Sequence, residues 1–215
     1  MKTKAHTRYT DSTGKRVSSV TTVIGESLGW NKNMLIAWAR REGMAGRDPH
    51  KVRDEAAEIG TLAHTLCENK ILGKDSDMSD YTPNQQKTAL ICFSAFCKWE
   101  KEIKPEYLAT EVKLVSEKLK VGGTFDGLYR LNGDLILYDL KSSKGVYDEM
   151  IIQLGAYTHM YEEIQPKAKI ESAVILRLDK ENGGFEHHDL SRGKLDWGFK
   201  AFKMCLELYK LKRSK

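Results

Sequence analysis

Apolar side chains recur every three to four residues along much of the chain, which is the spacing of one face of an α-helix. This pattern predicts a short helix beginning near residues 19–22, longer helices over 33–43, 51–72, 83–103 and 148–164, and a last helix after Ser191. Residue types at the ends agree with these bounds. Gly73 is a typical helix stop, and Thr82, Pro83 and Gln85 predict a capping box before the fourth helix.

Stretches rich in branched and aromatic apolar residues predict β-strands. They cover residues 15–18, 106–115, 121–130, 134–141, 169–178 and 184–190. Asn132-Gly133, between the third and fourth of these, is the strongest short signal for a two-residue hairpin turn. The almost continuous apolar run over 135–137 indicates a strand that is covered on both faces.

In chain order the predicted elements are helices, three strands, a helix, two strands and a helix, which predicts an α/β fold with one mixed sheet. A chain of 215 residues is long enough for one substantial core. We therefore expect a single domain. It has a mainly helical part over residues 1–104, a sheet core over 105–190 and a C-terminal helix over 191–215.

Composition narrows the class of protein. Hydrophobic residues make up 40% and charged residues 30%, which is typical of a globular protein and excludes wholesale disorder. No apolar run approaches the ~18 residues of a membrane span, and residues 1–13 lack the apolar centre of a secretory signal. We therefore expect a cytoplasmic protein with no membrane partner. The net charge of +5 is compatible with a nucleic-acid partner but does not require one.

The four cysteines fall in predicted helices and show no C-x-x-C spacing; they are Cys67, Cys92, Cys97 and Cys205. We interpret them as small buried thiols in a reducing compartment. Disulfides or a cysteine metal site are the less frequent alternatives for this spacing.

Two aspartates and a lysine near the predicted hairpin suggest chemistry. If Asn132-Gly133 is the turn, Asp126 lies directly opposite Asp139, and Lys141 shares the face of Asp139. Like charges so placed repel unless something positive lies between them. Two carboxylates and an ammonium group on one face can hold a hard divalent cation with a water beside it, which is the arrangement of metal-assisted hydrolysis.

The alternative is an ordinary surface hairpin in which Lys141 simply pairs with the two acids, which is the commoner outcome for an isolated Asp-x-Lys. The apolar run over 135–137 argues against it. Charges at the end of a buried strand are costly without a ligand.

Polar residues on the flanking elements are further candidates. His64 on the helix over 51–72 follows Gly60 by four residues, so the glycine clears space on the same face. Gln153 and Tyr157 share one face of the helix over 148–164, which returns over the end of the Lys141 strand. A structural role remains the alternative for each of them.

Other candidates would contact a nucleic acid. The loop residues Ser142, Ser143 and Lys144 are suited to phosphate contacts. Trp38 with Lys32, Arg40 and Arg41 could form an aromatic and basic surface for single-stranded nucleic acid, although a tryptophan at this spacing more often belongs to the core. Glu111 is either a further acid near the site or a plain surface charge.

Four motifs in this order resemble the PD-(D/E)XK nuclease superfamily, specifically its RecB-like exonuclease branch. They are Gly60-Thr61-x-x-His64, Gly123-Thr124-Phe125-Asp126, Asp139-Leu140-Lys141-Ser142-Ser143 and Gln153-x-x-x-Tyr157. Asp-x-Lys alone is a weak signal, but four motifs in the right order and spacing are strong together. The segments 19–24 and 38–41 are also similar to the mitochondrial genome maintenance exonuclease and related phage exonucleases, so the resemblance spans roughly residues 17–190.

The resemblance implies a restriction-endonuclease-like core, which is a central mixed β-sheet flanked by helices, with an N-terminal helical elaboration. It also implies metal-dependent cleavage of DNA. Mg²⁺ or Mn²⁺ would be held by His64, Asp126, Asp139 and the backbone carbonyl of Leu140. Lys141 would orient or activate the attacking water, while Gln153 and Tyr157 would position that lysine and the substrate strand.

Some members of the family hold an iron–sulfur cluster with one cysteine before the core and three near the C-terminus. Only Cys205 is near the end of this chain, so we expect no iron–sulfur cluster.

The resemblance leads us to expect a Mg²⁺- or Mn²⁺-dependent exonuclease that acts on single-stranded DNA or DNA ends in repair, recombination or replication. Its setting would be a bacterial or phage-infected host cell. Two alternatives remain open at this point. One is a structure-specific endonuclease or junction resolvase, and the other is a catalytically silent DNA-binding module with the same fold.

Overall fold

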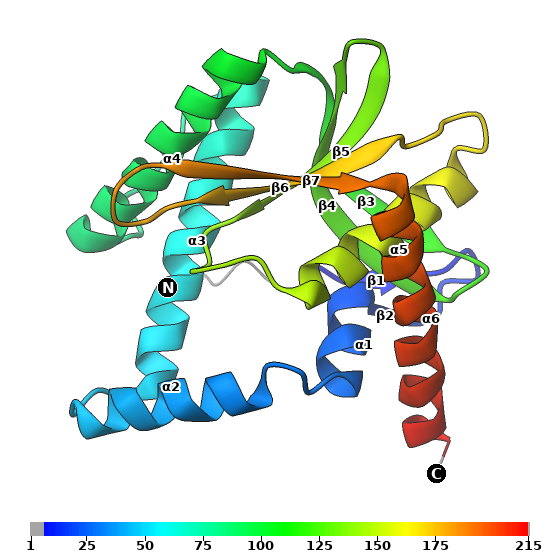
Figure 1. Ribbon diagram of the computed structural model, residues 1–215, viewed down its shortest axis with the longest axis horizontal. Coiled ribbons are helices and arrows are strands. Elements are labelled where there is room, and N and C mark those ends of the chain that lie inside the picture. The colour runs from blue at the N-terminus through cyan, green and yellow to red at the C-terminus, as the bar shows by residue number, and fades with distance from the viewer. Residues whose placement is uncertain (1–6, 215) are drawn as a thin grey trace.

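The computed structural model describes residues 7–214, and the centre of this part of the chain is a mixed β-sheet of seven strands (Figure 1). The strands are β1 (Tyr9–Thr10), β2 (Arg16–Ser19), β3 (Glu106–Ser116), β4 (Val121–Leu131), β5 (Asp134–Lys141), β6 (Ser172–Leu178) and β7 (Phe185–Ser191). They lie in the order β1-β2-β4-β5-β6-β7, and β3 also pairs with β4. β2 runs parallel to β4 and β5 parallel to β6, whereas the other pairs are antiparallel.

Helices cover both faces of the sheet (Figure 1). On one face lie α1 (Val20–Ser27), α5 (Asp148–Ile164) and α6 (Arg192–Arg213). On the other face lie α3 (Pro49–Leu72) and α4 (Pro83–Ile103). α2 (Lys32–Met44) connects α1 to α3 at a distance from the sheet.

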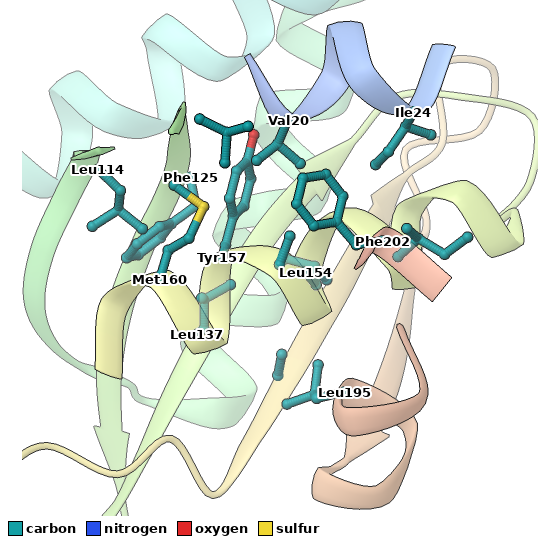
Figure 2. Packing of buried hydrophobic residues seen from close by; sticks show 14 of the residues in the cluster. Val20, Ile24, Leu114, Phe125, Leu137, Leu154, Tyr157, Met160, Leu195 and Phe202 are labelled. Atoms are coloured by element: carbon teal, nitrogen blue, oxygen red, sulfur yellow. The ribbon is translucent and has the colours of Figure 1, made fainter. Parts of the chain in front are cut away.

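Each face of the sheet has its own hydrophobic core. Leu137 of β5 packs with Leu154 of α5 and Phe202 of α6 in the first core, which Figure 2 shows. The next residue of the strand, Tyr138, packs with Trp99 of α4 in the second core. β5 is therefore covered on both faces, as its apolar run predicts, and its polar end is enclosed by helices.

The architecture confirms the predicted α/β fold, with a central mixed sheet flanked by helices, and is consistent with a restriction-endonuclease-like core. Two caps show how local residues set the helix ends. Thr82 Oγ1 accepts the N–H of Gln85, and Gln85 Oε1 accepts the N–H of Thr82, so the capping box forms. Gly73 ends α3 with a left-handed φ of 64°.

The hairpin turn also forms as predicted. Asn132 and Gly133 both have positive φ, 53° and 95°, as a two-residue type I′ turn requires, and Leu131 pairs with Asp134. The sheet contains one strand that the sequence pattern does not predict. β1 is only two residues long, which is too short for an alternating pattern to appear.

α2 differs from the sequence-based expectation. The spacing of Trp38 favours a place in the core, and this prediction is wrong, because α2 has no buried residue. α2 lies beside the start of α3 and beyond the edge of the sheet, so no second layer covers it (Figure 1). Apolar residues such as Met34 and Leu35 are consequently exposed.

Of the four cysteines, Cys67, Cys92 and Cys205 are buried as predicted, whereas Cys97 is only partly buried; all four are free thiols. Within residues 7–214, none of the helices combines the length and the apolar character that crossing a membrane requires.

Candidate active site

The candidate catalytic residues lie where β4 changes its neighbour in the sheet. One edge of β4 is occupied by β3. Along the other edge, β5 pairs with β4 only from Leu131 to Gly127, and β2 pairs with Val121 and Gly122. Residues 123–126 lie between these two ladders, where the strands diverge and leave room for side chains.

Asp126 occupies this fork. Its Oδ2 accepts the backbone N–H of Leu140 at 2.6 Å, and its Oδ1 lies 3.2 Å from Nδ1 of His64. In a regular strand, side chains three positions apart lie on opposite faces of the sheet. Phe125 and Leu128 nevertheless belong to the same core, so β4 is irregular between them. The regular pairing of Asp126 with Asp139 that the turn alone predicts therefore does not form. The carboxylate of Asp126 takes over a hydrogen bond that the strand ladder would otherwise make.

Asp139 and Lys141 share one face of β5, as strand alternation predicts. The Asp139 side chain is buried, and its Oδ2 contacts the Nζ of Lys141. Within residues 7–214, Oδ2 has no other polar partner. This buried oxygen therefore has unused acceptor capacity.

Burial and mutual attraction shift the pKa values of all four groups. Burial raises the pKa of Asp139, and the nearby Asp126 raises it further, while Lys141 opposes the shift. Burial also raises the pKa of Asp126, but the neighbouring His64 and Lys141 outweigh this and leave that pKa below its usual value. For His64 and Lys141, burial lowers the pKa, but the two carboxylates more than compensate, so both pKa values lie above their usual values. The protonation state of each of these two acids and two bases therefore depends on the charges of the other three.

Gly60 explains how α3 approaches the end of β5. A Cβ placed on Gly60 would lie 3.0 Å from Oγ of Ser142, tighter than ordinary contact. Because glycine has no side chain, the helix passes close to the strand end, and His64 one turn later reaches Asp126. The structure thus brings together the two motifs that contain Gly60 and Asp126.

α5 brings the remaining motif to the same place. Gln153 donates from Nε2 to the hydroxyl of Tyr157 at 3.2 Å. The Tyr157 ring lies against Gly123, where a Cβ would approach the ring closer than 3 Å. Burial raises the pKa of Tyr157 well above its usual value, so its hydroxyl stays protonated.

A groove of about 990 Å³ opens beside Lys141. Its walls come from α1, α2, the first turns of α3 and the start of α5. The lining combines apolar side chains with cations; it includes Ile24, Leu35, Trp38, Lys32, Arg53 and Gln153. The exposed α2 is thus one wall of a groove that ends at the candidate catalytic lysine.

The other residues that were candidates for nucleic-acid contacts lie outside this groove. Ser142, Ser143 and Lys144 follow Lys141 directly, but the hydroxyl of Ser143 donates to the carbonyl of Gly145 within the loop. Arg41 is exposed on α2 and lines a separate depression of about 460 Å³, outside the groove that contains Lys141.

Two acids that sequence reasoning left open or missed lie beside the site. Glu111 of β3 and Glu68 of α3 line a small cleft together with His64 and Asp126. Glu111 has a left-handed φ of 48°, a conformation that residues other than glycine rarely adopt. No pattern in the sequence predicts this, because it depends on how β3 pairs with the irregular part of β4.

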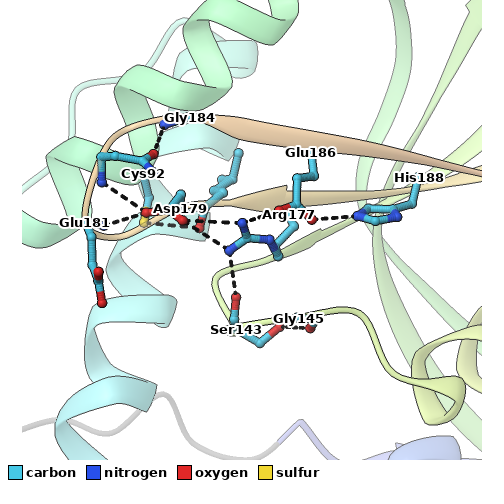
Figure 3. Close-up of polar contacts among 11 residues, drawn as sticks. Cys92, Ser143, Gly145, Arg177, Asp179, Glu181, Gly184, Glu186 and His188 are labelled. Atoms are coloured by element: carbon cyan, nitrogen blue, oxygen red, sulfur yellow. Dashed lines mark hydrogen bonds and ion pairs between the residues drawn. The ribbon is translucent and has the colours of Figure 1, made fainter.

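Sequence reasoning also missed Arg177 of β6, which lies next to Lys141 in the sheet. Figure 3 shows its guanidinium between the loop after β5 and two acids: it donates to the carbonyl of Ser143 at 3.4 Å and to Asp179 at 3.3 Å, and it contacts Glu186. Arg177 thereby ties the loop that follows Lys141 to the β6–β7 hairpin.

The donor types at the fork fit a hard divalent cation. Carboxylate oxygens, a backbone carbonyl and an imidazole are ligands that Mg²⁺ and Mn²⁺ accept, and Asp139 Oδ2 is open to a further partner. No group of three or more His, Cys, Asp or Glu side chains within residues 7–214 is already arranged to hold a metal ion. Each carboxylate instead contacts a basic side chain, His64 or Lys141.

Comparison with known proteins gives structural likeness only. No family model matches the chain, and no curated protein matches it. It is similar to a solved protein from Eubacterium rectale provisionally described as an exonuclease, at 11% identity and a TM-score of 0.40 over 68% of this chain and 73% of the other. It is also similar to an alkaline exonuclease from Laribacter hongkongensis, at 16% identity and a TM-score of 0.38 over 74% and 89%. Both superpositions are partial.

Proposed function

We propose that this chain is a metal-dependent nuclease that hydrolyses phosphodiester bonds in DNA. The observation that supports this best is the meeting of His64, Asp126, Asp139 and Lys141 at the fork of the sheet. These residues come from α3, β4 and β5, and they include the buried carboxylate of Asp139 and the partly buried carboxylate of Asp126, whose charges would otherwise be costly. Such a cost is common at sites that bind a cation for catalysis.

In this proposal His64, Asp126, Asp139 and the carbonyl of Leu140 hold Mg²⁺ or Mn²⁺. The bound ion would stabilise charge on phosphoryl oxygens and make a bound water more acidic. His64 would have to be neutral to bind it, because a protonated imidazole has no free electron pair. The Asp126–His64 contact would then be replaced by shared contacts to the ion.

Lys141 would act on the substrate side. Its pKa lies above its usual value, so the ammonium keeps its proton at neutral pH. It lines the groove beside Asp139, where a fixed positive charge stabilises the more negative transition state of phosphodiester cleavage. From α5, Gln153 would hold the substrate strand and Lys141 in position, and the buried Tyr157 would orient Gln153 through their hydrogen bond.

The groove supports DNA with accessible bases as the substrate. Trp38 and Leu35 offer apolar surface to bases, while Lys32, Arg53 and Lys141 offer charge to phosphates. A single strand presents both kinds of group, whereas a duplex keeps its bases stacked inside. We therefore propose an exonuclease that takes single-stranded DNA or frayed ends, in repair, recombination or replication inside a bacterial or phage-infected cell.

Digestion of end-labelled single- and double-stranded oligonucleotides, with Mg²⁺ or Mn²⁺ and then with EDTA, tests this function. We expect stepwise shortening from an end, loss of activity in EDTA, and no cleavage of circular single strands. Cleavage of circular or branched DNA would instead indicate an endonuclease or junction resolvase. Binding without cleavage would indicate a silent DNA-binding module.

Two variants and one control test the residue roles. Asp139→Ala should abolish cleavage, whereas Asp134→Ala, which removes an exposed acid at the other end of β5, should not. Lys141→Ala should keep Mn²⁺ binding by calorimetry but lower the cleavage rate by about 100- to 1,000-fold, the usual effect of removing one transition-state contact. A folded Asp139→Ala protein that still cuts DNA would refute the proposal.

A further inference from the structure

α6 carries a second apolar surface besides the face that it buries. Its buried face, with Leu195, Phe202 and Leu206, packs in the core with α5. On another side, four large apolar side chains are exposed to solvent: Trp197 by 46%, Met204 by 59%, Leu208 by 55% and Leu211 by 64%. Such exposure on one helix is unfavourable in water and indicates a surface that is covered in use.

The spacing of these residues forms a single stripe. Trp197, Met204 and Leu211 are seven residues apart, and Leu208 and the half-buried Ala201 follow four residues after Met204 and Trp197. Residues at these intervals line one side of a helix and form the seam when two helices pair. At 1.5 Å per residue the stripe is about 21 Å long. The surface is therefore shaped for another helix.

The two edges of the stripe differ. One edge adjoins the buried face of α6 at Cys205, and its last charged residue, Lys212, contacts Glu26 of α1. The other edge is polar and exposed, and it carries Lys200 and Glu207 one heptad apart. Among the residues that the structure describes, Glu207 forms one ion-pair contact, a long one of 3.5 Å with Lys210 of its own helix. An exposed pair of this kind contributes little, so Glu207 can form a better one.

We propose that the stripe is covered by α6 of a second copy of this chain, with the two helices antiparallel. When two such helices pack with Ala201 against Met204 and Trp197 against Leu208 of the other copy, their polar edges face each other. Lys200 of each copy then lies beside Glu207 of the other, so one twofold axis produces two ion pairs. In a parallel pair Lys200 would face the edge that adjoins the partner's core at Cys205, and Glu207 could meet only Lys212, which already contacts Glu26 of its own copy.

This self-complementary charge pattern is what selects a second copy over an unrelated partner. An isologous interface requires each charge to meet its opposite across the twofold axis, and Lys200 and Glu207 lie at matching distances on either side of the Lys203–Met204 bond. One helix face from each copy is a small contact, below the ~1,200 Å² of standard interfaces, so we expect a weak dimer. The inference does not depend on the nuclease activity.

Sedimentation analysis of the full chain at ~5 to 500 µM tests the proposal. The wild-type protein should pass from monomer to dimer over this range, and Leu208→Glu should remain monomeric with unchanged circular dichroism. Lys200→Glu and Glu207→Lys should each weaken the dimer by about tenfold, since both ion pairs become repulsive. Lys101→Glu makes the same charge change on α4, across the sheet from α6, and should leave the dimer unaffected.

Mixing the two weakened variants gives the decisive measurement. In the mixed dimer the glutamate introduced in one copy faces the lysine introduced in the other, and the unchanged Lys200 and Glu207 still face each other. An equimolar mixture of K200E and E207K should therefore dimerise at least as well as the wild type. A chain that is monomeric at ~500 µM would overturn the proposal, as would a dimer that the mixture does not restore.

Discussion

Replacing Gly123 by alanine should disturb the candidate site through Tyr157. A Cβ at position 123 would lie 3.1 Å from Cζ of Tyr157 and closer than 3 Å to Cε1, whereas ordinary contact begins at 3.4 Å. The Tyr157 ring is buried and packs beside Phe125, so it cannot swing into open space. The ring has to move by about 1 Å to restore ordinary contact, and its hydrogen bond with Gln153 moves with it.

The size of the effect follows from this geometry. Forcing an extra carbon into a packed core costs about 1–3 kcal/mol. In a chain of 215 residues each kcal/mol lowers the melting temperature by about 2–4 °C, so we expect a decrease of about 2–12 °C. A misplacement approaching 1 Å can lower a catalytic rate by up to about 100-fold, so cleavage should fall further than stability alone explains.

A double-mutant cycle isolates the contact. Tyr157→Leu removes the aromatic ring that the new methyl group meets, so Gly123→Ala should cost much less in that background than in the wild type. Urea unfolding followed by circular dichroism measures all four proteins, and Gly25→Ala, with no atom near its added Cβ, is the control. If Gly123→Ala is as stable as Gly25→Ala, or if its cost is the same with and without the ring, the reasoning is wrong.

Three further changes test other parts of the structure. Gly155→Ala adds a Cβ 2.5 Å from backbone atoms of Leu195 and Phe199 where α5 crosses α6, so it should lower stability in thermal unfolding by about 1–3 kcal/mol, partly offset by better helix propensity. Thr82→Ala removes the cap of α4 and should cost about 1 kcal/mol in urea unfolding; no loss would contradict the capping box. The hydroxyl of Thr13, helped by Lys120, lowers the pKa of Asp11, so its ionised form stabilises the fold above pH ~4 and this contribution disappears in more acidic solution. The stability difference between the wild type and Asp11→Asn should therefore shrink as the pH falls from about 6 to about 3, and a constant difference would contradict this.

The candidate site shows where prediction from sequence ended. The turn at Asn132-Gly133 and the alternation along β5 correctly placed Lys141 on the face of Asp139. The same reasoning extended the hairpin ladder to Asp126, where the strands in fact diverge. Divergence arises because β2, which is distant in sequence, pairs with the start of β4. A local pattern carries no information about such a neighbour.

The residues of this chain determine by themselves those features whose causes lie within a few positions. Helix caps, the hairpin turn and the two-sided apolar character of β5 belong to this group, because backbone hydrogen bonds and turn sterics act between near neighbours. Tertiary packing decided the rest: that α2 is exposed, that Glu111 lies beside Asp126, and that His64 reaches it across 62 residues of chain. These contacts exist only because helices and strands bury their apolar faces together, and that free energy depends on the whole fold rather than on any one segment.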